Sequence, residues 1–157
     1  MIRNKKSFGV PEVIEIQIET ETNDQEVALR KVLAYLRALY LNYQNSHWLA
    51  AGDHATHLLF ERLYTSLTDE MDSMAEKLIG VCGFQALNPC KQMEMINGCL
   101  AKWEQIECFY GRGTEAETEF LDLLKGMRGN IQFSEGVCNL LDGIADVHEG
   151  NIYLLKR

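Results

Sequence analysis

Four side chains that can bind a metal recur along one stretch of the sequence that has the pattern of a single long helix. They are His57, Glu61, Asp72 and Glu76. At about 100° per residue, with His57 set to zero, the other three lie at about 40°, 60° and 100°, so all four share one face. Imidazole and carboxylate ligands together suit iron in both oxidation states and leave positions open for an oxidant. The face therefore predicts metal chemistry.

The length of this helix prevents one chain from closing the site. His57 and Asp72 are fifteen residues apart, roughly 22 Å at 1.5 Å per residue, whereas ligands of a first-row metal stand roughly 2 Å from the ion. An identical helix packed antiparallel across a two-fold axis would bring the His57 end of one chain to the Asp72 and Glu76 end of the other. We therefore expect a site shared between two copies.

The rest of the helix fits that arrangement. Its apolar stripe points between about 240° and 320°, well away from the ligand face. The stripe consists of Phe60, Leu63, Leu67, Met71, Met74 and Leu78. We expect the stripe to face the subunit's own core and the ligand face to be covered by a partner.

Two long helices are predicted to form an antiparallel pair. Thr22 and Gln25 form a capping-box pattern that opens a first helix with apolar residues at three- and four-residue steps. His47 continues its apolar stripe, and Gly52 ends it. Asp53 can cap the second helix, which is expected to run to about Gly80 or Gly83.

The second half of the chain predicts two more main helices after a crossover. Between Phe84 and Gly113 the pattern is broken by Pro and Gly, which indicates a connection with one or two short helices. Thr114 opens a third main helix and Ser134 caps a fourth. The prediction is an all-α, ferritin-like four-helix bundle with a long crossover, containing a short helix, between the second and third helices.

The first residues have a different character. In residues 13–19 apolar side chains alternate with the polar Glu15, Gln17 and Glu19, as in a strand. Because no second strand is indicated, we expect residues 1–21 to form an extended arm, with a true sheet as the alternative, and residues 22–157 to form the bundle.

The composition of the chain disfavours several classes of function. The net charge of −8 disfavours wrapping of nucleic acid around the body of the protein and suits cation uptake. The five cysteines are odd in number and lack a two-residue-spaced pair, so we interpret them as free thiols that act as small buried apolar groups. No apolar run is long enough for a membrane span, and we expect a cytoplasmic protein.

These residues resemble the central signature of the Dps family, the DNA-binding proteins from starved cells, also called miniferritins. The resemblance is carried by His47-Trp48-x-x-x-Gly52, by His57, Glu61 and Leu63-Tyr64, by Asp72-x-x-x-Glu76-Lys77-Leu78, and by the ending from Leu140-Leu141 through His148-Glu149 to Leu155. The gap between Gly52 and His57 is two residues shorter than the usual family pattern, and Glu61 stands where Asp is common.

The resemblance implies a dodecameric shell that takes up ferrous iron, oxidises it preferentially with hydrogen peroxide, stores the ferric product and so protects DNA in the nucleoid. His47 and His57 would be ligands from one subunit, and Asp72 and Glu76 would come from its two-fold partner. Glu76 would bridge towards a second iron position, which Glu61 would serve directly or through water. The family's tryptophan corresponds to Trp48, expected to pass electrons or quench radicals.

Other interpretations stay open at this point. His54 competes with His57 as a ligand, although His57 shares the carboxylate face under helix geometry. The bundle could also be a non-catalytic shell that uses the same face for association alone. A third possibility is a nucleoid-associated protein that binds DNA weakly through Arg3, Lys5 and Lys6.

Overall fold

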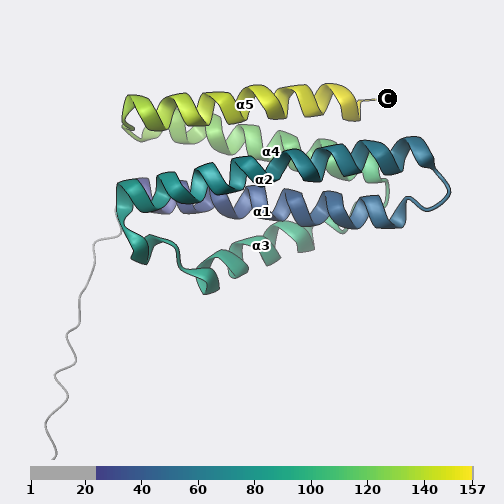
Figure 1. Ribbon diagram of the computed structural model, residues 1–157, viewed down its shortest axis with the longest axis horizontal. Coiled ribbons are helices and arrows are strands. Elements are labelled where there is room, and N and C mark those ends of the chain that lie inside the picture. The colour runs from purple at the N-terminus through teal and green to yellow at the C-terminus, as the bar shows by residue number, and fades with distance from the viewer. Residues whose placement is uncertain (1–23, 157) are drawn as a thin grey trace, which may run out of the picture.

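The computed structural model describes residues 24–156, and every regular element in this range is helical (Figure 1). The helices are α1 (Asp24–Leu49), α2 (His54–Cys82), the 3-10 turn η1 (Phe84–Ala86), α3 (Pro89–Trp103), α4 (Phe109–Asn130) and α5 (Glu135–Leu155). The predicted all-α, ferritin-like bundle with a helix in its crossover is confirmed. The expected arm over residues 1–21 and the cap at Thr22 lie outside the described residues.

Two antiparallel helix pairs make up the bundle. α1 packs along α2, α4 packs along α5, and α1 also contacts α4. α3, which belongs to the crossover, lies against α1 on the side away from α5 (Figure 1). None of the helices between residues 24 and 156 is long and apolar enough to span a bilayer.

The position of α1 between α2, α3 and α4 explains its burial. Its buried side chains are not confined to one stripe, and they include Ala28, Leu29, Val32, Leu33, Ala34, Leu36, Ala38 and Leu39. α3 is held against it by the Arg37 guanidinium, which donates to Gln92 at 2.5 Å, and by the edge-to-face contact of Tyr35 with Trp103. A partner chain can therefore contact α1 only on the part of its surface that α3 does not cover.

The predicted helix ends are mostly confirmed by their caps. The Asp53 carboxylate accepts from Thr56 N at 3.1 Å and begins α2, and Gly83, at a φ of 87°, ends it. The Ser134 hydroxyl accepts from Val137 N at the start of α5. Short polar side chains satisfy otherwise unpaired amides at these positions.

The expected start of the third main helix at Thr114 is wrong. α4 begins at Phe109, so Gly111 and Gly113 lie inside a helix and not in a loop. The reason is packing: a Cβ on Gly113 would stand 3.0 Å from Leu155 Cδ2 and 3.4 Å from Tyr43 Cε1. A glycine here lets α4 approach α1 and α5 closely, which outweighs its low helix propensity.

This close approach gives a prediction within one helix. Gly113→Val should lower the free energy of unfolding by about 1–3 kcal/mol, because the added atoms overpack a buried contact. Gly126→Val, in the same helix but with nothing within 4 Å of its Cβ position, should raise it by a few tenths of a kcal/mol at most, since valine is the better helix former. Urea denaturation of both variants measures the difference, and equal effects would contradict the packing argument.

Candidate metal centre

The turn between α1 and α2 brings the first two predicted ligands together. His47 lies in the last turn of α1 and His57 in the first turn of α2. The connection between the helices is only four residues long because Gly52 adopts a φ of 91° and Asp53 caps α2 at once. The two imidazoles therefore face each other across the hairpin.

The two histidines bind each other's backbone. His47 Nδ1 lies 3.0 Å from the His57 carbonyl oxygen, and His57 Nδ1 lies 3.0 Å from the His47 carbonyl oxygen. The rings stack with centroids 3.8 Å apart and an interplanar angle of 30°. A carbonyl oxygen can only accept, so each Nδ1 carries the hydrogen and donates it. Each Nε2 in the neutral ring then keeps its lone pair, the form in which imidazole binds a metal.

Glu61, one turn after His57, completes a three-residue cluster. One ligand atom from each of His47, His57 and Glu61 lies within 4.8 Å of the other two. Among residues 24–156 this is the one group of three such side chains with metal-binding spacing. His54 is exposed and does not belong to it, which agrees with the preference for His57.

The surroundings of the cluster are asymmetric. His47 is only 9% exposed, and its ring packs edge-to-face against Tyr64 with centroids 5.3 Å apart. Glu61 is exposed on the outer surface of α2. Two imidazoles and one carboxylate with open positions are the donor set of non-haem ferrous iron sites. The residues present therefore fit ferrous iron as a substrate.

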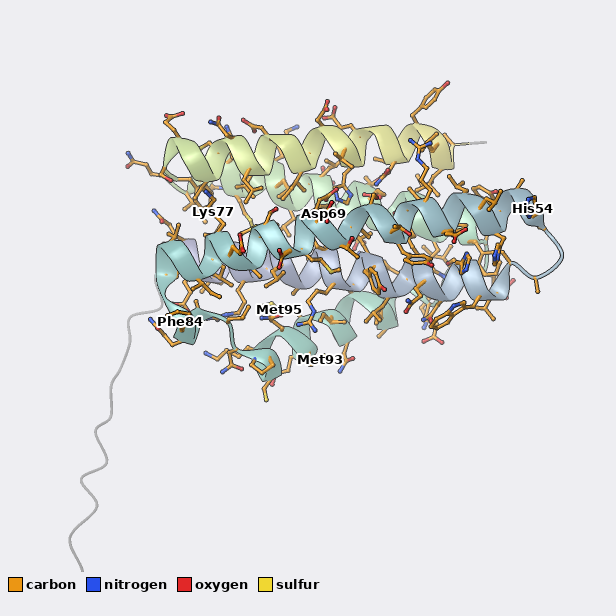
Figure 2. All side chains as sticks on the ribbon, in the orientation of Figure 1. His54, Asp69, Lys77, Phe84, Met93 and Met95 are labelled. Carbon is orange, nitrogen blue, oxygen red and sulfur yellow. The ribbon has the colours of Figure 1, made fainter. Side chains whose placement is uncertain are left out.

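Asp72 and Glu76 stand apart from this cluster. Figure 2 shows His54 at the turn between α1 and α2, Asp69 midway along α2, and Lys77 towards the far end. Asp72 and Glu76 lie between Asp69 and Lys77 in the sequence, and both are exposed. Fifteen helical residues separate Asp72 from His57, roughly 22 Å. Within one chain the structure thus brings together His47, His57 and Glu61, but neither of the other two carboxylates.

Trp48 and the five cysteines do not belong to the cluster of His47, His57 and Glu61. Trp48 follows the first histidine and is 62% exposed, so it is not a core side chain. All five cysteines are free. Cys99 is buried as expected, but Cys90 and Cys108 are exposed, which contradicts the expectation that the thiols are buried apolar groups.

The bundle also contains a buried polar cluster that the sequence analysis missed. His148 of α5 is fully buried between two carboxylates: its Nδ1 donates to Glu117 and its Nε2 to Glu70 at 3.0 Å. Glu117, also fully buried, accepts in addition from Tyr43 Oη at 2.5 Å and from Asn151 Nδ2 at 3.0 Å. All four helices of the bundle contribute a side chain to this cluster.

The two carboxylates determine the charge of His148. Burial by itself would lower the pKa of His148, but the hydrogen bonds to Glu117 and Glu70, together with their charges, raise it to about 9. Two donated hydrogen bonds require both ring nitrogens to be protonated, so the ring is an imidazolium. Burial and the Glu117 carboxylate likewise raise the pKa of Tyr43 and keep the phenol protonated.

A signal for this cluster was present in the sequence. Glu117 lies on the same apolar stripe of α4 as Gly113 and Phe120, and His148 lies on the stripe of α5 with Ile144. Carboxylates are almost never buried without a partner. A carboxylate on one apolar stripe and a histidine on another are therefore candidates for a buried pair.

Known proteins give an independent comparison for this fold and cluster. The chain is 26% identical over 132 residues, 81% of its length, to the "Nutrient stress-induced DNA-binding protein" of Synechococcus sp., of which the match covers 75%. No protein-family model matches the chain, and no solved structure matches it significantly. The fold and the surface cluster define a ferritin-like helical protein. The relative's name is one used in the Dps family, so the comparison supports a Dps-like protein.

The buried cluster predicts how stability depends on pH. A His148 pKa of about 9 in the folded state, against 6.5 when unfolded, stabilises the folded state by about 3 kcal/mol at pH below 6.5, and this contribution is lost as pH rises to about 9. The free energy of unfolding should therefore fall between pH 6.5 and 9 in the natural protein. His148→Gln should be less stable at pH 6.5 and show a flatter profile.

The matched control is His54→Gln, which changes an exposed histidine on α2. It should leave the pH profile of urea denaturation unchanged. A profile of His148→Gln that is as steep as that of the natural protein would contradict the charge assigned to the buried imidazolium.

Proposed function

We propose that the protein oxidises ferrous iron at sites shared by two chains, with hydrogen peroxide as the preferred oxidant, and stores the ferric product inside a dodecameric shell. One observation carries the proposal: three side chains that can bind a metal, His47, His57 and Glu61, have ligand atoms within 4.8 Å of one another. Two further carboxylates lie on the same helix face beyond the reach of one chain. The resemblance to the Dps signature supports it.

The histidines and the carboxylates have different roles at the proposed site. The two Nε2 atoms hold Fe²⁺ in a fixed direction, because the Nδ1 hydrogen bonds prevent either ring from turning. Carboxylates from both chains, Glu61 on one side and Asp72 and Glu76 on the other, offset the extra positive charge that appears when Fe²⁺ becomes Fe³⁺. The electron loss is thereby favoured at the site over loss in free solution.

Two ferrous ions together supply the two electrons that reduce one molecule of hydrogen peroxide. Each Fe²⁺ gives one electron, and H₂O₂ with two protons accepts both and yields two waters, so no hydroxyl radical is released. Glu61 and Glu76 are the carboxylates proposed for the second iron position. Trp48, exposed beside His47, would donate an electron when only one iron is bound. Removing iron and peroxide together is the proposed protection of DNA.

A mixing experiment tests the shared site. His57→Ala and Asp72→Ala should each reduce peroxide-dependent Fe²⁺ oxidation at least about tenfold, since even indirect changes around a metal commonly cost that much. When the two variants are unfolded together and refolded as a mixture, heterodimers pair the intact His57 of one chain with the intact Asp72 of the other. Half of the sites in each heterodimer regain activity.

The outcome separates the models. A site confined to one chain gives no recovery on mixing, and oxidation that is undiminished in either variant rejects the proposed ligands. His54→Ala and Asp69→Ala change an exposed histidine and an exposed carboxylate of the same helix, and both should oxidise iron at the natural rate. Particle mass and iron per particle after loading distinguish a storage shell from a non-catalytic one.

DNA binding is a second candidate, favoured by the name of the relative, a DNA-binding protein, and by Arg3, Lys5 and Lys6 near the start of the sequence. Three positive charges give a weak, salt-sensitive attraction to phosphates. Retardation of a DNA duplex should appear only at low salt and should disappear when residues 1–12 are removed. Retardation that survives this removal would show that another surface binds DNA.

A further inference from the structure

An apolar groove lies beside Asp72, in the half of α2 that is further from the histidine cluster. It has a volume of about 530 Å³ and runs between α1, α2 and the start of α3. Its lining includes Leu33, Met71, Ala75, Leu87, Pro89 and the Asp72 side chain. Most of this lining is apolar, which favours an apolar or aromatic occupant.

The other end of the same surface carries an exposed aromatic side chain. Trp48 is 62% exposed, and the neighbouring Leu49 and Leu58 are exposed as well. Trp48 lies fifteen residues after Leu33 on α1, which corresponds to a rotation of about 60° around the helix. It lies eleven residues after Arg37, which corresponds to a rotation of about 20°. Trp48 therefore shares a face of α1 with both of these groove residues. The Leu33 end of the groove and the indole are therefore about 22 Å apart along α1.

The spacing on the two helices is the same. Leu33 and Trp48 are fifteen residues apart on α1, and His57 and Asp72 are fifteen residues apart on α2. The midpoints of these two intervals fall at residues 40–41 and 64–65. The Tyr40 and Tyr64 rings contact each other edge-to-face with centroids 5.6 Å apart, so both midpoints lie at the same level of the helix pair.

A single two-fold axis that passes near the Tyr40–Tyr64 pair therefore brings Leu33 of one chain opposite Trp48 of the other, and His57 of one chain opposite Asp72 of the other. The antiparallel overlay that brings His57 of one chain to Asp72 of the other also places Trp48 of the first chain over Leu33 of the second. We infer that Trp48 of each chain inserts into the groove beside Asp72 of its two-fold partner and is the main anchor of the dimer. The inference rests on the two-fold pairing proposed above and specifies which side chain holds it.

The chemistry of the contact suits this role. An exposed indole loses a large apolar area from water when it enters a groove, and tryptophan is among the residues that dominate binding at interfaces. The contact occurs twice in each dimer because the interface is self-complementary. It also keeps the proposed iron ligands of the two chains in register, since Trp48 follows His47 directly and the groove includes Asp72.

The first test measures the anchor. Trp48→Ala should weaken association of two chains at least about thirtyfold, the effect of a hot-spot residue, as measured by the mass distribution on dilution. Trp48 should also be protected from acrylamide quenching in the associated protein and exposed after dilution, whereas Trp103 is fully buried in the chain itself and should stay protected throughout. Tyr153→Ala removes another highly exposed aromatic ring and should not change two-chain association.

The second test determines whether Trp48 of one chain fits the groove of another chain. Ala75→Trp should fill the groove and block it, so that neither this variant nor Trp48→Ala pairs well with itself. A mixture of the two should form heterodimers, because the Trp48 of the blocked chain meets the open groove of the other. Leu87→Arg, which changes the rim of the groove, replaces Ala75→Trp if the latter fails to fold.

The outcomes separate this inference from the proposed function. Trp48 is not the anchor if Trp48→Ala associates as strongly as the natural protein and acrylamide quenches Trp48 in the associated natural protein. If the natural protein still oxidises iron, the ferroxidase proposal remains intact. That result would also follow if the chain's own first residues or a small apolar molecule filled the groove. Protected Trp48 and complementary pairing without iron oxidation support the anchor and reject the chemistry. Chains that never associate contradict both.

Discussion

The proposed chemistry depends on two crossed hydrogen bonds between His47 and His57. Each imidazole donates from Nδ1 to the backbone carbonyl of the other residue, so the same contacts select the tautomer, orient both rings and join the end of α1 to the start of α2. No additional side chain is needed to prepare the two nitrogen ligands. Glu61 then joins them from the next turn of α2, and the rest of the bundle serves to hold these two helix ends together.

Histidine has opposite roles in the two polar clusters because its hydrogen-bond partners differ. At the surface, the partners of His47 and His57 are carbonyl oxygens, which fix one nitrogen of each ring and leave the other with a lone pair. In the bundle core, both nitrogens of His148 face carboxylates, which hold a cation and exclude a metal from that ring. The chain thus separates a cluster suited to metal binding from one suited to stabilising four packed helices by charge.

Helical periodicity and capping residues were sufficient to predict the bundle, and the shared face of His57 and Glu61 was sufficient to prefer His57 over His54. The start of α4 could not be predicted, because Gly111 and Gly113 are local loop signals and only the distant Leu155 and Tyr43 explain why Gly113 is helical. The Glu117–His148 pair was missed for a related reason. Its two members are thirty-one residues apart, and only the packing of α4 against α5 brings the two apolar stripes that carry them together.

The four-residue connection between α1 and α2 limits how this region can change over evolutionary descent. Adding or removing one residue within the first turn of α2 would rotate His57 by about 100° relative to His47, and the mutual carbonyl contacts would be lost. Length changes are tolerated only where the connecting loop absorbs them before Asp53 restarts the helix.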